Sequence, residues 1–497
     1  MFHLWMLFFL LYLIPTIGFA QQVNRFTLLK SSQTKIEFNN KIKDRKDANI
    51  LIYSNFYGGA GVGVGDFNND GLQDLYFAGN MVPDKLYFNQ GNFEFKDVTQ
   101  IAGINDDGGW STGVTVADVN NDGKLDIYVS RELYDDKPEQ RANLLYINKG
   151  NGKFEESAQK YNVADSQRTR HATFLDYNKD GFLDLFLLTQ PPNPGSYSPF
   201  SGTTLLKEEY HIKLYKNTGN NFFIETTEDA GLMLTGFPNG VSASDINNDG
   251  WTDLYVANDF NAPDFLLLNN QDGTFTNITD NALNHMSYYS MGVDVADINN
   301  DALLDIFVVD MVAEDNFRLK SNMSGMNPDS FWKVVQEGGH YQYMYNALQL
   351  NNGNVTFSDV AQITGMAATD WSWSNLIVDF DNDGLKDTYI TNGLLHDIRN
   401  TDADKKIGNL INETTFKYLE ENPQGGNITS VFDILDLDKV LSVLPSQPLQ
   451  NYAFKNMGDL NFKKVMDIWG LDEESFSNGS AYADLDNDGD LDLLVNN

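Results

Sequence analysis

The chain has 497 residues, with 70 Asp and Glu against 34 Lys and Arg, so its formal net charge is −36. This acidity excludes a conventional nucleic-acid interface, which needs clustered basic side chains. The sequence contains no cysteine, which excludes disulfides, thiolate zinc sites and cysteine nucleophiles. Hydrophobic residues make up 41%, enough for a large core, so the excess carboxylate needs an explanation other than disorder.

The chain begins with an apolar run, Leu4 to Ile17, of the length of a signal-peptide core. Gly18 and Ala20 then supply small residues where a signal peptidase reads the chain. Because no Lys or Arg precedes the run, a buried N-terminal helix is the alternative. We predict a signal peptide over residues 1–20 and an exported protein that is secreted, periplasmic or on the cell surface. No later segment is apolar for long enough to predict a membrane span.

A nine-residue motif, Asp-x-Asn/Asp-x-Asp-Gly-x-x-Asp, occurs seven times, and each copy precedes an apolar strand. The first copy begins at Asp66 and the last at Asp484, and one copy has Ala at the Gly position. Oxygen atoms at positions 1, 3 and 5 of a tight loop can converge on one hard cation. The position-7 carbonyl and the position-9 carboxylate can complete the shell. Glycine at position 6 allows the sharp turn, and an oxygen-only donor set favours calcium.

The motif predicts up to seven Ca²⁺ sites, with an Asx-rich turn that binds no ion as the alternative. An EF-hand is excluded because position 12 of the first loop is Phe77, inside a strand. Copy five has Ala302 in place of glycine and is expected to be strained, whereas Asp381 and Asp486 at position 3 predict the tightest sites. The predicted ligands are Asp66, Asn68, Asp70, Leu72, Asp74; Asp118, Asn120, Asp122, Lys124, Asp126; Asp176, Asn178, Asp180, Phe182, Asp184; Asp245, Asn247, Asp249, Trp251, Asp253; Asp297, Asn299, Asp301, Leu303, Asp305; Asp379, Asp381, Asp383, Leu385, Asp387; and Asp484, Asp486, Asp488, Asp490, Asp492.

Each motif belongs to a longer unit of four short strands. In the second unit these are a small-residue strand at 111–118, an apolar strand at 125–129 and a hairpin at 143–154. Four antiparallel strands repeated seven times predict an all-β fold, a seven-bladed β-propeller over residues 50–497, with helical insertions between strands.

Several stretches resemble FG-GAP (VCBS-type) repeats, the calcium-loop blades of integrin alpha-subunit propellers. They are residues 68–72, 310–311, 369–373 and 379–384, and they are similar to a bacterial subgroup related to ASPIC/UnbV-containing proteins and to cartilage acidic protein. The resemblance implies a calcium-binding propeller and leaves the biochemical activity open.

The seventh unit stops after its second strand. Residues 21–49 contain two strand-like pieces, 25–30 and 34–38, that could supply the missing strands and close the ring. The alternative, which we favour, is that the sequence is a fragment that lacks the rest of this blade and an ASPIC/UnbV module.

The three long insertions, at about 190–212, 310–345 and 391–450, all join second to third strands. They should therefore share the face of the ring opposite the calcium loops, which we call the insertion face, and the last two have helical patterning. Loops on a rigid scaffold often carry function.

Eight residues before each loop, at the insertion face, five of seven side chains are aromatic. These side chains either fill the gaps between blades or act as stacking platforms for a ligand. His171 stands where most blades carry glycine, close to Arg168 and Arg170, and this basic cluster either binds an anion or neutralises nearby carboxylates. The seven residues that stand eight positions before the first Asp of a loop are Gly58, Trp110, Arg168, Phe237, Tyr289, Trp371 and Phe476.

The sequence contains no recognisable catalytic motif. We therefore predict that the protein is not an enzyme. We expect an exported calcium-binding propeller that acts as a ligand-binding or adhesion module and binds a glycan or protein through its insertion face. The alternatives are a calcium-dependent polysaccharide lyase or hydrolase, and a structural component of a cell-surface assembly.

Overall fold

The computed structural model describes residues 24–497 except 106, 135, 192–209, 261, 323–325, 425–427 and 429. The predicted signal peptide and most of the first insertion lie outside the described residues.

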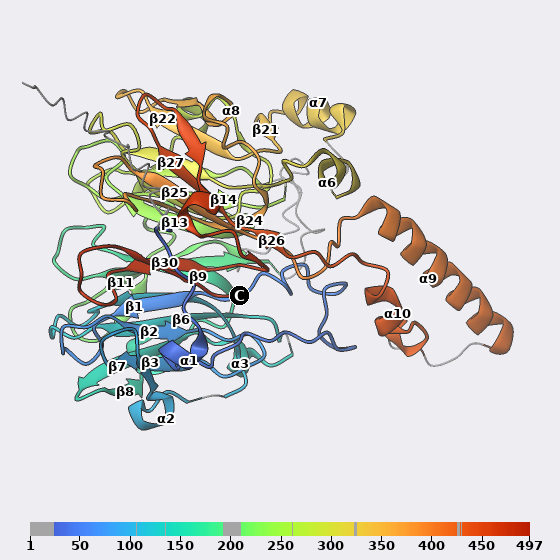
Figure 1. The fold of residues 1–497 in the computed structure, drawn as a ribbon, viewed down its shortest axis with the longest axis horizontal. Helices are drawn as coiled ribbons and strands as arrows, with labels where there is room; N and C mark the ends of the chain where they lie inside the picture. The colour runs from blue at the N-terminus through green and yellow to red at the C-terminus, as the bar shows by residue number, and fades with distance from the viewer. Residues whose placement is uncertain are drawn as a thin grey trace, which may run out of the picture.

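The described residues form mostly antiparallel sheets (Figure 1). Each motif loop joins the first strand of a sheet to the second. In the first sheet Gly65 pairs with Asp74, so the position-9 carboxylate begins the second strand. The first three sheets are β1 (Val62–Gly65), β2 (Asp74–Phe77), β3 (Lys85–Asn89) and β4 (Phe95–Asp97); β5 (Trp110–Ala117), β6 (Asp126–Glu132), β7 (Leu144–Gly150) and β8 (Lys153–Glu156); and β9 (Arg168–Leu175), β10 (Asp184–Gln190), β11 (Lys213–Asn217) and β12 (Phe223–Glu225).

The later sheets repeat this order with interruptions. Two short pairings, parallel β17–β21 and antiparallel β26–β29, lie outside the main sheets, and β20 adds to the edge of β24. The strands are β13 (Pro238–Ser244), β14 (Asp253–Asn258), β15 (Phe265–Asn269) and β16 (Phe275–Asn277); β18 (Val293–Ala296), β19 (Asp305–Val308), β22 (Ala347–Asn351) and β23 (Phe357–Asp359); β24 (Asp370–Val378), β25 (Asp387–Asn392), β27 (Tyr452–Asn456) and β28 (Phe462–Lys464); β30 (Ser480–Ala483) and β31 (Asp492–Val495); and β17 (Met286–Ser287), β20 (Met311–Val312), β21 (Gln342–Tyr343), β26 (Leu449–Gln450) and β29 (Glu474–Ser475).

The first strands contact one another in a closed cycle, β1 to β5, β9, β13, β18, β24, β30 and back to β1. Figure 1 shows β30, near the C-terminus, beside β1. The Asn496 amide joins the two ends by donating to the Gly61 carbonyl at 3.1 Å. The fold is therefore all-β and propeller-like, as predicted.

The core lies between neighbouring sheets rather than at the centre of the ring. Tyr76 and Leu86 of the first sheet pack with Ile127 and Val129 of the second in one buried cluster. Every residue of β2 and β6 is buried, because neighbouring sheets cover both faces of these strands.

The helical patterning predicted in the last two insertions is confirmed. The longest helix, α9, extends away from the sheets in Figure 1, and Asn400 caps its N-terminus. The insertion helices are α6 (Asn316–Ser321), α7 (Pro328–Gln336), α9 (Thr401–Glu421), the 3₁₀ turn η3 (Val431–Asp433) and α10 (Leu437–Leu441). Short helices elsewhere are α1 (Ser31–Thr34), α2 (Thr99–Ala102), α3 (Pro138–Arg141), α4 (Ala158–Tyr161), α5 (Thr279–Ala282), α8 (Ala361–Thr364) and α11 (Met466–Trp469). Within the described part of the chain, no helix has both the length and the apolarity to cross a bilayer.

The two strands predicted at 25–30 and 34–38 are not formed, since this segment is irregular apart from the single turn α1. It is held by packing instead. Phe26 joins the cluster of Trp469 in α11 and Leu493 in β31, and Phe38 stacks on Phe77 of β2 with ring centroids 5.0 Å apart. The alternating pattern of residues 34–38 therefore serves side-chain burial rather than strand pairing.

Candidate metal loops and central cavity

The seven motif loops share one hydrogen-bonded conformation. In the first, the two carboxylate oxygens of Asp66 accept the backbone N–H groups of Asp70 at 3.0 Å and Gly71 at 2.8 Å. Asn68 Oδ1 accepts the Asp70 N–H as well, at 2.9 Å. The position-1 Asp makes the same pair of bonds in the other six loops. The backbone therefore folds around the side chains at positions 1 and 3.

The position-9 carboxylate is buried in six of the seven loops. Asp74 accepts the N–H groups of Phe67 at 2.9 Å and Asn89 at 2.8 Å. Burial, opposed by these bonds and reinforced by the neighbouring position-1 and position-5 carboxylates, raises the pKa of Asp74 to about 7. Burial, opposed by backbone hydrogen bonds and reinforced by carboxylates of the same loop, likewise raises the pKa of Asp126, Asp184 and Asp387 to about 7 and that of Asp253, Asp305 and Asp492 to about 6. A cation in the loop would favour the ionised form of these groups.

The last two loops bring three carboxylates together. Asp379, Asp381 and Asp387 each place an oxygen within 4.8 Å of the others, and Asp484, Asp486 and Asp492 do the same. These all-oxygen donor sets fit a hard divalent cation such as calcium.

A lysine ammonium takes part in loop six. Lys455 of β27 forms ion pairs with Asp381 and, at 2.7 Å, with Asp383. Its ammonium group therefore supplies positive charge to the carboxylates that are predicted to hold the metal.

Loop five carries the strain expected from its sequence. Ala302 has φ +68°, and the glycines at the same position of the other loops have φ between +80° and +90°. A side chain in this left-handed region is unfavourable.

Asparagine at position 4 was not among the predicted site residues. Asn487 of the last loop donates to the Gly71 carbonyl of the first loop at 3.1 Å, and Asn121, Asn248, Asn300 and Asn382 bridge to the next loop in the same way. The sequence could have indicated this position, because six of the seven copies have asparagine at position 4 and the other has Lys179. The bonds tie adjacent loops together around the ring.

Most of the aromatic side chains predicted at the insertion face are buried. Trp110 is 1% exposed and packs with Phe56, while Phe237 packs with Phe260, and Trp371 is also buried. The stacking-platform interpretation is therefore wrong for Trp110, Phe237 and Trp371, because other parts of the chain cover them. Phe56 comes from the segment before β1, Phe260 follows β14, and Met311 of β20 pairs with Trp371. Among the other candidates, Tyr289 and Phe476 are partly buried, and Arg168 lies over the Tyr53 ring at 5.0 Å.

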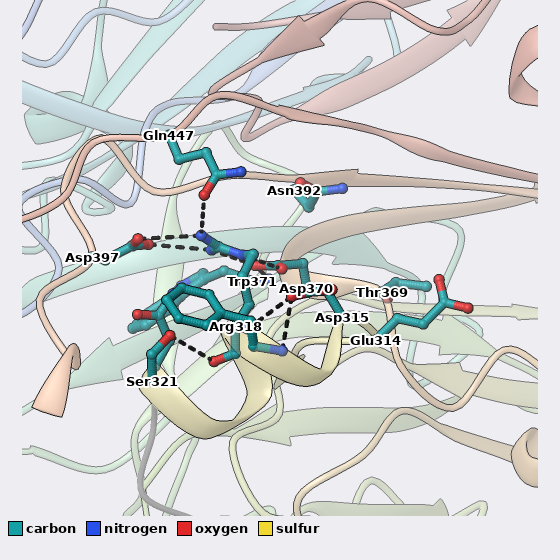
Figure 2. A network of polar contacts seen from close by, with 12 residues as sticks. Glu314, Asp315, Arg318, Ser321, Thr369, Asp370, Trp371, Asn392, Asp397 and Gln447 are labelled. Atoms are coloured by element: carbon teal, nitrogen blue, oxygen red, sulfur yellow. Dashed lines mark hydrogen bonds and ion pairs between the residues drawn. The ribbon is translucent and has the colours of Figure 1, made fainter.

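A buried ion network joins the two helical insertions (Figure 2). Arg318 of α6 donates to both Asp370 oxygens at 2.7 and 2.9 Å, and to both Asp397 oxygens at 3.2 Å. Its Nη1 also donates to Gln447 Oε1 at 3.1 Å. Asp370 begins β24 with φ +63°. One guanidinium thus holds the second insertion, the third insertion and the start of a first strand in a fixed arrangement.

A cavity of about 340 Å³ lies where the first strands converge. It is lined by residues in the first strand of every sheet or just before it, on the side nearer the insertion face. Glycine makes room for the bulkier lining groups. A Cβ on Gly113 would lie 2.5 Å from His171 Nδ1, and one on Gly58 would lie 2.5 Å from Arg170 Nη2.

The repeated sheets and their common loops define a repeat protein of the β-propeller-like class. The FG-GAP-like repeat family matches residues 46–129, 137–187 and 245–308. These parts of the chain are therefore FG-GAP-like repeats.

Curated relatives support this assignment. Cartilage acidic protein 1 is 27% identical over 205 residues in Mus musculus and 26% identical over 205 residues in Homo sapiens. Each match covers 41% of this chain and 29% of the relative. The Xenopus tropicalis protein is 30% identical over 138 residues, which is 27% of this chain and 20% of the relative. The matched region therefore spans less than a third of these relatives.

Two solved structures have a distantly similar architecture. One describes recognition of non-reducing terminal N-acetylglucosamine by an Agrocybe aegerita lectin, with a TM-score of 0.43 and 16% identity over 88% of this chain and 86% of the lectin. The other is the V. cholerae biofilm matrix protein Bap1, with a TM-score of 0.32 and 13% identity over 65% of this chain and 42% of that protein. Both scores are low.

Proposed function

We propose that the chain is an exported, seven-bladed, calcium-stabilised propeller that binds a glycan or protein ligand through its insertion face. The seven loops and the closed cycle of seven first strands support the blade count. The position-1, position-3, position-5 and position-9 oxygens would hold each ion. When bound, calcium supplies positive charge to the clustered carboxylates.

The observation that carries the binding role is the exposed aromatic surface of the insertion helices. Phe317 in α6 is 76% exposed and Trp332 in α7 is 52% exposed, and Tyr341 follows α7 with 43% of its surface exposed. Large aromatic side chains on a rigidly held surface are typical anchors for a partner. The Arg318 network holds α6 against the ring, which limits the entropy lost on binding.

A glycan and protein array probed in calcium tests this proposal. We expect binding to fall by about tenfold or more for Trp332→Ser or Phe317→Ser, since central aromatic anchors dominate interface energies. Ile224→Ser is the matched control, because Ile224 is comparably exposed but lies on the outer strand β12. Equal loss in the control, or no loss in the helix variants, contradicts the assigned face.

Metal removal tests the calcium sites. We expect EDTA to lower the melting temperature and calcium to restore it, because an ion that binds only the folded state adds stability. A melting temperature unaffected by EDTA would contradict the proposal that the loops bind calcium.

We propose binding without turnover. Incubation with acidic polysaccharides should release no new ultraviolet-absorbing ends, and release would favour the lyase alternative instead.

A further inference from the structure

The central cavity differs in charge from the rest of the molecule. No Asp or Glu lines it among the described residues, whereas Arg170, His171 and Trp373 do. In a chain with a net charge of −36, a pocket with a cationic and no anionic lining group selects for an anion.

Arg170 retains hydrogen-bonding capacity. Its Nη2 donates to the Gly58 carbonyl at 2.8 Å, and its Nη1 is buried with no hydrogen-bond partner among the described residues. The Glu132 carboxylate lies 3.9 Å from Nη1 and interacts electrostatically with Arg168 too. A separation of 3.9 Å is too long for a hydrogen bond, so Nη1 can still donate to a ligand, and a guanidinium matches a carboxylate in geometry.

The remaining lining groups fit hydroxyls and a ring rather than a bare ion. Burial, followed by the Arg170 charge, lowers the pKa of His171 to about 4, so the imidazole is neutral near pH 7 and can both donate and accept. Asn375 lines the cavity with its Oδ1 unpartnered in the described structure. The Trp373 indole is fixed by its bond to the Gly393 carbonyl at 2.7 Å and lies 5.9 Å from the Arg170 guanidinium.

The volume limits the ligand to about one sugar unit. About 340 Å³ is the volume of roughly eleven liquid waters at about 30 Å³ each, at the low end of ligand pockets.

We infer that this cavity binds a single hexuronic acid unit, with its carboxylate at Arg170, its ring beside Trp373 and its hydroxyls at His171 and Asn375. The inference deepens the proposed binding function by assigning an acidic sugar to the axis of the ring, so the ligand would be the exposed end of an acidic polysaccharide.

Calorimetric titration of the calcium-loaded full chain tests the inference. D-glucuronate and D-galacturonate are the probes, and D-glucose and acetate are the controls. We expect saturable binding of at least one uronate and at least tenfold weaker binding of both controls. Equal binding of glucose, equal binding of acetate, or no binding of either uronate overturns the inference.

Substitutions at Arg170 and Glu132 test whether the uronate binds in this cavity. We expect Arg170→Gln to weaken uronate binding by about tenfold or more, because hydrogen bonds to charged groups are the stronger ones, and Lys463→Gln on the outer strand β28 to leave it unchanged. Since Arg170→Gln leaves Glu132 short of a partner, the pair Glu132→Gln and Arg170→Gln provides a neutral replacement that should also fail to bind. Uronate binding retained in the double variant overturns the site, while loss of array binding in Trp332→Ser alone bears only on the proposed function.

Discussion

The Arg318 network offers a direct test of how the insertion face is held. Arg318, Asp370 and Asp397 have side chains only 9%, 10% and 5% exposed, and the guanidinium makes five hydrogen bonds of 2.7 to 3.2 Å to these carboxylates and Gln447. Arg318→Met removes all five and leaves two buried carboxylates without their cation. The formal charge of the group changes from −1 to −2.

Removing one partner of a buried ion pair costs about 3–5 kcal/mol. At about 1.4 kcal/mol for each factor of ten, local opening of the insertions should become about a hundred-fold to several thousand-fold more frequent. Because the network joins insertions to the ring rather than one sheet to the next, the effect should be confined to α6 and to residues near Asp397.

Native-state hydrogen exchange, followed by mass spectrometry of peptides that cover α6 and residues 394–400, measures this opening. Arg318→Lys keeps the charge without the planar fork and should give an intermediate effect. Lys405→Gln in the exposed Lys405–Asp402 pair should change nothing measurable. Exchange that rises less than about threefold in Arg318→Met would refute the argument, as would an equal rise throughout the sheets.

Three further substitutions test the loops and the core. Ala302→Gly should raise the free energy of unfolding without metal by about 1 kcal/mol, because it relieves the left-handed alanine; a denaturant titration showing a decrease would contradict this. Lys455→Met should tighten the metal site that contains Asp381 and Asp383, since the competing ammonium is removed, and unchanged affinity in a calcium titration would count against competition. Trp110→Ala should lower the free energy of unfolding by about 3–5 kcal/mol, whereas a loss below about 1 kcal/mol would mean that the side chain is not core.

Local patterns carried the prediction of the loops and strands. The strands of each unit, the turn at position 6 and the strain at Ala302 all depend on residues close together in the chain, so their spacing can be recognised without the fold. The helical character of α9 was likewise predictable from its periodicity. The prediction of strands at 25–30 and 34–38 was wrong because a period-2 pattern indicates which side chains are buried but not which strand would pair with the segment.

Some residues of the candidate site could be predicted from local sequence, and others could not. The loop ligands follow from spacing alone, but the burial of Trp110 and Trp371 depends on segments that arrive from elsewhere in the chain. The Arg318 network joins residues 52 and 79 positions apart. No local pattern relates these residues.

By itself, the sequence determined the repeat, its oxygen-rich loops and the all-β class, because each arises from contacts within a few residues. Only the tertiary structure decided which aromatic residues are core, which asparagines link the loops, and that Arg170 and His171 share a cavity free of carboxylates among its described lining residues. Those properties depend on ring closure, which sets distant first strands side by side and gives each side chain surroundings that its own neighbours in the chain do not specify.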